Sequence, residues 1–346
     1  MPRIETLLVE GYGVYVGKHS DRLVVRKGRA VLTEAPVRFL RTVVIMGRGV
    51  SLSADALALC AGHGVPIHYL SPRGVPYATL YTAGLTGTVR TRRAQMLAYT
   101  DTRGVALAAA MARGKIANQA RLLKYLAKRR RERDGDTYRF LRSAARAVAR
   151  HDQEIDAWQA RAWSEGVEAH RESLLAIEGR AAQVYWDGIG AILRPKLDWP
   201  GRRGRGARDP FNAALNYGYG ILYGQVTQAC LLAGLDPYAG FIHADRPGKP
   251  SMVLDLIEEF RAPVVDRAVL GLVGRGTALE QDAEGLLTLE TRRAIAGRVL
   301  QRLEESTERY EGKRQKLRWI LQSQARHVAT FLRGERSEYR PFMAGW

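Results

Sequence analysis

The 346-residue sequence has few cysteines, and neither of them belongs to a recognisable motif. Cys60 and Cys230 stand in apolar surroundings, and no CxxC motif surrounds either one. A disulfide framework or a cysteine-based zinc site is therefore not expected. We predict that both are reduced residues of the protein core.

The sequence also lacks a long apolar run. No stretch of about 18 apolar residues occurs, which argues against a membrane-spanning helix. The first residues, MPRIETLLVEGYGVYV, lack the basic and then apolar pattern of a secretory signal peptide. These absences predict a soluble, cytoplasmic protein that makes no membrane contact.

Acidic residues are outnumbered by basic ones. The 54 Lys and Arg side chains exceed the 35 Asp and Glu side chains, and the formal net charge is +19. Such a surplus favours a polyanionic partner through phosphate contacts and counterion release. Nucleic acid is the partner that the charge favours most.

The pattern of the first 89 residues is typical of short strands. Apolar, β-branched runs such as TLLVE, TVVIM and VPIHYL alternate with turn residues. One helix is expected in SADALALCAGHG, where Ser53 could cap its start and Gly62 or Gly64 could end it. We predict an N-terminal β-rich domain over residues 1–89.

Residues 90–346 have long helical periodicity instead, with apolar residues three to four positions apart. The fold class predicted is therefore α+β, with an N-terminal β domain followed by a larger all-helical domain. After the helical run that begins near Arg90, further helices are expected over residues 143–162, 173–193, 210–233, 255–271 and 289–332.

The segment HADRPGKPSMVLDLIEEFR places a histidine, His243, upstream of three acids, Asp255, Glu258 and Glu259. A helix beginning near Ser251 would put Asp255 and Glu258 on one face, because residues at i and i+3 are neighbours. With a nitrogen beside two carboxylates, this set suits Mn²⁺ or Mg²⁺. The alternative from this segment alone is a packed histidine beside solvated acids.

A second acid, Glu178, falls on or beside the apolar stripe of the helix RESLLAIEGRAAQVYW. A lone buried carboxylate is costly unless it is paired or bound to a metal. From the residues alone, Glu178 either takes part in a metal site or pairs with Arg180 or Arg203.

Three blocks in this order carry a resemblance to a known family: LLAIEGRAAQVYW, then DPFNAALNYGYGILYGQVTQACLLAGLDPYAGFIH, then PSMVLDLIEEFR. The sequence resembles the CRISPR-associated integrase that inserts new spacers, the Cas-one family, along nearly its whole length. The segment GVSLSADALALCAGHGVPIHYLSPRGVPYATL and the closing YRPF agree with it.

The resemblance implies a catalytic divalent metal, Mn²⁺ or Mg²⁺, held by Glu178, His243 and Glu258. Asp255 matches a second acid of the motif and is a further candidate ligand, whereas Glu259 is expected to be a bystander. The implied chemistry joins a DNA 3′-hydroxyl to a phosphodiester, or hydrolyses it with water at the same site.

The resemblance also implies partners. These are double-stranded DNA, branched DNA and single-stranded DNA ends, a second copy paired through the N-terminal domain, and the dimer of a small CRISPR adaptation protein. The alternatives are an architectural DNA-binding protein without activity and a basic RNA-binding protein. The intact acids argue against the first, and the lack of an aromatic RNA-recognition run argues against the second.

Further residues are expected to contact DNA. One group lies in or near a glycine-rich loop, where backbone and guanidinium could approach phosphates closely, and one of the tyrosines that follow could stack on a base. These candidates are Arg202, Arg203, Arg205, Arg208, Tyr219 and Tyr223. A second basic run lies on the helix from Lys115 to Arg131, and a solvated helix face explains it equally well.

Overall fold

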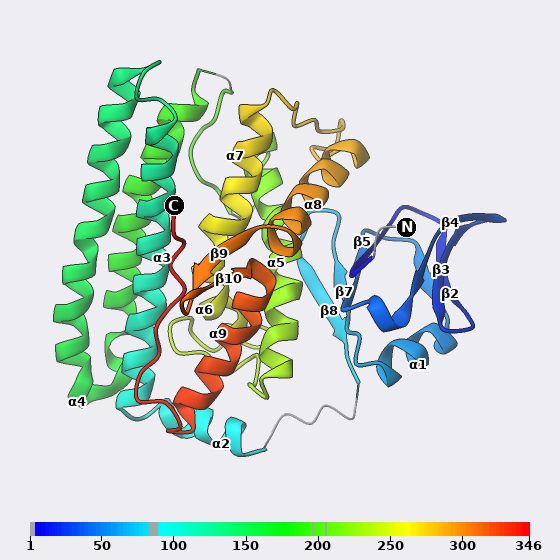
Figure 1. Ribbon diagram of the computed structural model, residues 1–346, viewed down its shortest axis with the longest axis horizontal. Coiled ribbons are helices and arrows are strands. Elements are labelled where there is room, and N and C mark those ends of the chain that lie inside the picture. Colours follow the sequence, from blue (N-terminus) through cyan, green and yellow to red (C-terminus); the bar gives the residue numbers. More distant parts are fainter. Residues whose placement is uncertain (1–3, 83–88, 196, 205) are drawn as a thin grey trace.

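The computed structural model describes residues 4–82, 89–195, 197–204 and 206–346. Two small sheets form the N-terminal part, and a larger, mainly helical part follows (Figure 1). This arrangement confirms the α+β prediction. The proposed boundary at residue 89 stands beside residues 83–88, which lie outside the described residues, so the exact boundary stays a prediction.

Eight strands build the two N-terminal sheets. One sheet has the order β1-β5-β7-β8 and the other β4-β3-β2-β6. The strands are β1 (Thr6–Glu10), β2 (Val14–His19), β3 (Arg22–Lys27), β4 (Ala30–Pro36), β5 (Thr42–Met46), β6 (Val50–Leu52), β7 (Ile67–Leu70) and β8 (Pro76–Leu80). The expected helix is α1 (Ala54–Gly62), and Ser53 Oγ accepts a hydrogen bond from Ala56 N at 3.1 Å as its cap.

Strand β5 divides its side chains between two cores. Val43 and Ile45 belong to the core of the N-terminal part, whereas Val44 and Met46 belong to the large core of the helical part. Successive side chains of a strand point to opposite faces, so this sheet is buried on both sides. The sheet therefore fixes the N-terminal part against the helices that carry the candidate site.

The turn between β7 and β8 lies directly on helix α5 (Pro210–Leu232). A Cβ added at Gly220 would overlap the backbone of Gly74, and one added at Gly74 would overlap the backbone of Tyr217. Gly74 also has a φ of +75°, which favours glycine. These two glycines allow the close approach.

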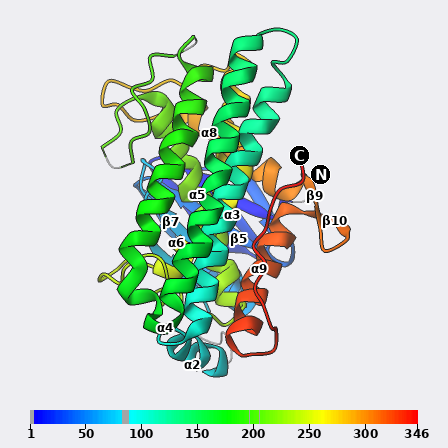
Figure 2. The same ribbon diagram turned by 90° about the vertical axis from the view of Figure 1, so that its left-hand side faces the viewer.

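The helical part is organised around two long helices, α3 (Thr102–Lys128) and α4 (Gly135–Leu193), which lie side by side (Figure 2). Asp101 caps α3 by accepting a hydrogen bond from Arg103 N at 2.8 Å. The other elements are α2 (Val89–Ala98), α6 (Ser251–Phe260), a π-helical segment (Arg261–Asp266), α7 (Arg267–Gly274), α8 (Leu289–Glu304), β9 (Thr307–Tyr310), β10 (Lys313–Lys316) and α9 (Leu317–Leu332).

Two helical predictions differ from the structure. The helices expected over 143–162 and 173–193 are parts of α4, which has a break at Gly166 with φ +83°. The single helix expected over 289–332 is wrong, because the hairpin of β9 and β10 interrupts it. Its turn contains Glu311 at φ +46° and Gly312 at φ +78°, and two successive positive φ values suit a tight hairpin turn.

Among the described residues, no helix is long and apolar enough to cross a membrane.

Candidate metal centre and DNA-binding cleft

Two buried glutamates from different helices share one lysine. Glu178 of α4 is 2% exposed and Glu258 of α6 is 4% exposed. Lys115 Nζ, from α3, lies 3.4 Å from Glu178 Oε1 and 3.2 Å from Glu258 Oε2. Three helices therefore bring two carboxylates and one ammonium together inside the helical part.

A second cation is paired with Glu258. Arg261 lies one turn further along, and its Nη1 is 2.7 Å from Glu258 Oε1. Burial opposes ionisation of Glu258, but Arg261 and Lys115 outweigh burial and lower the pKa of Glu258. Burial raises the pKa of Glu178 against the charge of Lys115, and the neighbouring Glu258 raises it further. The pKa values of the two carboxylates shift in opposite directions because the ion pair of Arg261 is made with Glu258.

His243 lies at the same site, in the segment between α5 and α6. Its positive charge, when protonated, lowers the pKa of both Glu178 and Glu258. His243 Nδ1 lies 2.7 Å from Asp255 Oδ1, the carboxylate that orients its ring. When Nδ1 carries the proton and donates it to Asp255, Nε2 keeps its lone pair for a ligand.

Asp255 is fully buried, and hydrogen bonds surround its carboxylate. Its Oδ2 accepts from Phe241 N at 2.5 Å and from Ile242 N at 2.9 Å, and its Oδ1 accepts from His243 N at 3.0 Å. Asp255 thus fixes the backbone that carries His243. Sequence spacing alone could not show that Asp255 and Glu258 have different surroundings. The difference arises because residues 241–243, which lie outside the helix, fold back and donate hydrogen bonds to Asp255.

The environment of this cluster fits a divalent cation. As the side chains lie here, no three His, Cys, Asp or Glu residues in the described part of the chain form a group that could hold a metal ion. However, the two glutamates already share the Lys115 ammonium, and the buried Glu178 Oε1 accepts no hydrogen bond from the described residues. Two hard oxygen donors beside an oriented imidazole match the preferences of Mn²⁺ and Mg²⁺.

The sequence analysis expected Glu259 to be a bystander of the metal site, and in the structure its carboxylate binds a different part of the chain. It is fully buried and binds the C-terminal segment, accepting hydrogen bonds from Tyr339 Oη at 2.6 Å, Phe342 N at 2.8 Å and Gln324 Nε2 at 3.0 Å. Burial raises the pKa of Glu259 to about 7, although these hydrogen bonds favour its charged form. Glu259 therefore ties the end of the chain to the helix that carries Glu258.

A cleft of about 1090 Å³ adjoins the site through Arg261, the partner of Glu258. Its walls come from the β7–β8 turn, the segment around residues 202–208, α5, the stretch from α6 to Arg261, and residues 283–287. Four of the predicted DNA contacts line it together with the site residue Arg261: Arg202, Arg208, Tyr219 and Tyr223. The sequence could not show this grouping, because the cleft joins five separate parts of the chain.

Two of these residues are held by other contacts. Arg202 donates to Asn216 Oδ1 at 2.8 Å and to Asn212 Oδ1 at 3.1 Å. Tyr219 is buried and donates to Asp266, and the guanidinium groups of Arg202 and Arg261 lie 5.5 and 4.9 Å from the centre of its ring. Arg202 and Tyr219 therefore shape the cleft wall.

The other predicted contacts differ in exposure. The Arg203 and Arg208 side chains are exposed, and Tyr223 is half-buried. Arg205 lies outside the described residues. Among the described residues of this segment, Arg203 and Arg208 are consequently the basic side chains that face solvent.

The basic run on α3 does not form one solvated face. Lys115 points to the glutamates, and Arg121 donates to the backbone oxygen of Ala344. Lys124 and Lys128 are exposed. The helical phase offered a signal for Lys115, since it lies three and four residues after the buried Ala112 and Met111.

Comparison with known proteins adds independent support. The family model described as "CRISPR associated protein Cas1" matches residues 7–301. A CRISPR-associated endonuclease Cas1 of Archaeoglobus fulgidus is 37% identical over 351 residues, covering 98% of this chain and 99% of that protein. A Cas1 endonuclease of Francisella tularensis subsp. novicida is 32% identical over 98% of this chain and 99% of that protein.

Solved structures share the fold. A casposase bound to an integration product has a TM-score of 0.80 at 22% identity, and the match covers 97% of this chain and 93% of that one. A chain of a Cas6-RT-Cas1–Cas2 complex has a TM-score of 0.78 at 19% identity, covering 98% of this chain and 36% of that one. Family match, curated relatives and fold agree: this chain belongs to the Cas1 family of CRISPR-associated endonucleases.

Proposed function

We propose that the protein is a metal-dependent DNA endonuclease and integrase of CRISPR adaptation. It joins the 3′-hydroxyl of incoming DNA to a phosphodiester of the CRISPR array. The observation that carries this proposal is the pair of buried glutamates, Glu178 and Glu258, which share one cation next to His243.

Glu178, Glu258 and His243 Nε2 are the proposed ligands of one Mn²⁺ or Mg²⁺ ion. When bound, such an ion polarises the phosphoryl oxygen and stabilises the charge that develops during displacement. Asp255 supports the ligand set by holding His243 Nδ1 and the backbone of the segment that carries the histidine.

The chain's own cations complete the electrostatics. Arg261 and Lys115 lie beside the carboxylates, so the site offers positive charge to a phosphate as well as ligands to a metal. The cleft next to Arg261 supplies the path for the DNA strand, with Arg208 and Tyr223 on its walls. The exposed Arg203 lies in the same segment and binds the backbone electrostatically.

Assembly is proposed to involve the N-terminal sheets. Strand β4 is at the edge of its sheet, and it exposes Val31 and Leu32 by 51% and 56%. An exposed edge with apolar side chains favours pairing with another chain. A second copy is the proposed occupant, and a small adaptation protein is the further partner, in keeping with the Cas1–Cas2 complex whose chain shares this fold.

The decisive experiment is strand transfer. A short DNA duplex is incubated with supercoiled plasmid and the purified protein, with Mn²⁺ or with EDTA. Wild type is expected to join the duplex to the plasmid only with the metal. Glu178→Gln and Glu258→Gln are expected to lose joining, whereas Glu172→Gln, a change at an exposed acid of the same helix α4, retains it.

The same experiment separates the proposal from an architectural role. An architectural protein binds the plasmid but does not join the duplex to it, with Mn²⁺ or without. Joining that continues in EDTA, or in both glutamate variants, would contradict the proposal.

A further inference from the structure

The C-terminal segment, residues 339–346, lies against two of the helices that supply the candidate metal centre. It runs along α3, where it is drawn in red (Figure 1). Asn118 of α3 is fully buried, and its Nδ2 donates to the backbone oxygens of Glu259 and Phe342 at 2.8 Å each. Asn118 Oδ1 accepts from Ala344 N at 2.8 Å. One side chain of α3 therefore binds both the C-terminal segment and the backbone of α6.

Neighbouring residues of these helices face the metal centre and the C-terminal segment. On α6, Glu258 faces Lys115, whereas Glu259 binds the C-terminal segment, because successive residues of a helix point about 100° apart. On α3, Gly114 precedes Lys115. A Cβ added at Gly114 would lie 2.7 Å from Pro341 Cβ and 3.0 Å from Glu259 Cγ. The metal centre and the C-terminal segment are thus one residue apart on both helices.

The Glu259 carboxylate is held by groups that come from beyond α6. Its Oε1 accepts from Tyr339 Oη at 2.6 Å, and its Oε2 accepts from Phe342 N at 2.8 Å and from Gln324 Nε2 at 3.0 Å. Gln324 Nε2 also lies 3.2 Å from Tyr339 Oη, so the donors are connected with one another. A buried network with its members satisfied is more rigid than separate hydrogen bonds.

An aromatic contact holds the same turn of α6. The rings of Phe260 and Phe342 stack, with centroids 5.3 Å apart and planes inclined by 12°. Helix α6 has only 10 residues, and the π-helical segment follows it directly at Arg261. The position of so short a helix depends on its packing against other segments. Residues 339–342 therefore help to fix the turn of α6 that carries Glu258.

We propose that Glu259 is a positioning residue of the metal centre, which acts through the C-terminal segment. By holding the last turn of α6 against α3, it sets where Glu258 lies relative to Glu178 and Lys115. Ligands must be held within about 0.5 Å of their productive geometry by the contacts around them. Glu259 thus raises the affinity of the site for Mn²⁺ without contacting the ion or DNA. The inference rests on the proposed function and deepens it.

Titration of full-length variants with Mn²⁺ by isothermal calorimetry tests the proposal. Glu259→Ala removes all three hydrogen bonds and is expected to bind Mn²⁺ at least about tenfold more weakly than wild type. Glu259→Gln keeps the shape and one oxygen that can accept from Phe342 N, so its affinity should lie between the two. Tyr339→Phe removes only one hydroxyl and is expected to weaken binding by a factor of about two to ten.

A variant at the far end of the C-terminal segment separates positioning from general stability. Trp346 Nε1 donates to Glu308 Oε1 at 2.7 Å, and the Arg267 guanidinium lies 4.5 Å from the Trp346 ring centre. Trp346→Phe loses this hydrogen bond but leaves the contacts of Glu259 in place. It should lower the melting temperature and leave the Mn²⁺ affinity unchanged.

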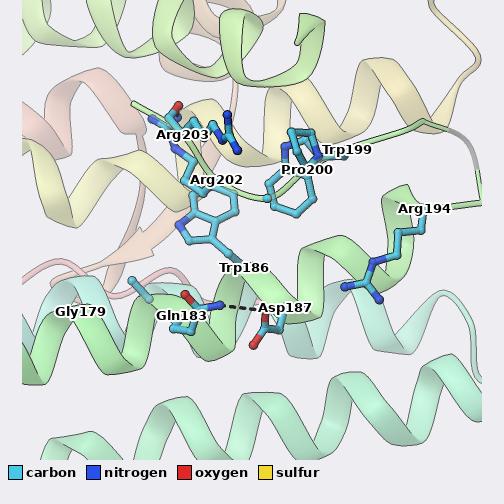
Figure 3. A pocket seen from close by; sticks show the side chains of 11 residues that line it. Gly179, Gln183, Trp186, Asp187, Arg194, Trp199, Pro200, Arg202 and Arg203 are labelled. Atoms are coloured by element: carbon cyan, nitrogen blue, oxygen red, sulfur yellow. Dashed lines mark hydrogen bonds between the residues drawn. The ribbon is translucent and has the colours of Figure 1, made fainter. Parts of the chain in front are cut away.

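An acid on another helix of the site is the matched control for Glu259→Gln. Asp187 is exposed on α4, the helix that carries Glu178, and its Oδ1 accepts from Gln183 Nε2 at 3.0 Å (Figure 3). Asp187→Asn changes the same chemical group and should bind Mn²⁺ as wild type does.

Electron paramagnetic resonance of the bound Mn²⁺ gives a second measurement. A general loss of stability does not alter the ligand geometry of the molecules that stay folded, whereas a displaced Glu258 does. At saturating Mn²⁺, the spectra of Glu259→Ala and Tyr339→Phe should differ from that of wild type. Trp346→Phe and Asp187→Asn should have the wild-type spectrum.

The outcomes distinguish this inference from the proposed function. Wild-type affinity and spectrum in Tyr339→Phe and in both Glu259 variants would overturn the positioning role while leaving the metal centre in place. Equal weakening in Trp346→Phe would also overturn it, because stability alone would then explain the loss. If Glu259→Ala does not fold, Glu259→Gln and Tyr339→Phe decide. Wild type that binds no Mn²⁺ would overturn both the metal centre and this inference.

Discussion

Lys115 Nζ lies 3.2 Å from Glu258 Oε2 and also faces Glu178, so one buried ammonium compensates two carboxylates of the candidate metal centre. A metal ion bound by the same oxygens would compete with this lysine. Lys115 therefore affects both the stability of the metal-free protein and its affinity for the metal ion. Removing one partner from a buried charge cluster leaves the other charges uncompensated.

Replacing this lysine should therefore have two opposite effects. Lys115→Met is expected to destabilise the metal-free protein by about 3 kcal/mol and to increase the stabilisation that Mn²⁺ provides. Thermal unfolding in EDTA measures the stability of the metal-free protein, and unfolding at increasing Mn²⁺ concentrations measures the stabilisation by the metal. Lys124→Met, at an exposed lysine of α3, is the matched control. A variant as stable as wild type in EDTA would show that Lys115 does not balance the glutamates.

Asp255 is expected to act through His243 and its backbone. In Asp255→Asn, an amide nitrogen replaces one oxygen that accepts backbone N–H groups, so the segment 241–243 loses order. We expect a lower melting temperature and Mn²⁺ affinity reduced about 10- to 100-fold, measured by calorimetry. Asp245→Asn changes an exposed acid of the same segment and should leave both unchanged. Normal stability with normal affinity in Asp255→Asn would contradict this role.

The contact between the N-terminal sheet and α5 should be sensitive to acid. Burial lowers the pKa of His68 to about 4, and the ring lies against Gly224 of α5. Its Nδ1 is 3.1 Å from Thr79 Oγ1, and Nε2 is buried without a hydrogen-bond partner among the described residues. The folded protein therefore holds His68 neutral where the unfolded chain protonates it.

This difference makes the unfolded state bind more protons between about pH 6.5 and pH 4, so His68 costs stability as the pH falls through that range. The loss reaches about 3 kcal/mol. Urea unfolding at pH 7 and pH 5 should show a smaller decline in His68→Gln than in wild type. The His19→Gln variant, which changes an exposed histidine of β2, should lose as much stability between pH 7 and pH 5 as wild type does. Equal declines in wild type and His68→Gln would refute the assignment.

The arginines of the 202–208 segment should separate into two roles. Arg203→Gln and Arg208→Gln combined are expected to reduce the slope of log affinity against log salt by about 0.9 for each lost phosphate contact on duplex DNA. Arg202→Gln should instead increase proteolysis of this segment, because Arg202 is bonded to Asn212 and Asn216. If Arg202→Gln alone flattens the slope as much as the double variant, the roles are reversed.

The sequence predicted those parts of the fold that depend on local patterns. Ser53 as a helix cap follows from its neighbours alone, and the buried position of Glu178 follows from helical phase. The β9–β10 hairpin was missed because TERYEGKRQK is polar and lacks the usual Asn-Gly or Asp-Gly turn.

The parts of the site that depend on long-range contacts could not be predicted. Spacing placed Asp255 and Glu258 on one face of a helix, but only the returning segment around His243 separates their environments. Glu259 was taken as a bystander because its partners, such as Tyr339, come from the C-terminal segment about 80 positions away. Lys115 was overlooked because a lysine in a basic run is usually solvated.

Titration of the purified full-length protein with Mn²⁺ by isothermal calorimetry tests the central claim most directly. The account predicts one ion per chain in wild type and at least tenfold weaker binding in Glu178→Gln, Glu258→Gln and His243→Ala. Glu172→Gln should bind as wild type does. Unchanged Mn²⁺ affinity in the two glutamate variants would contradict the assignment of this cluster as the metal centre.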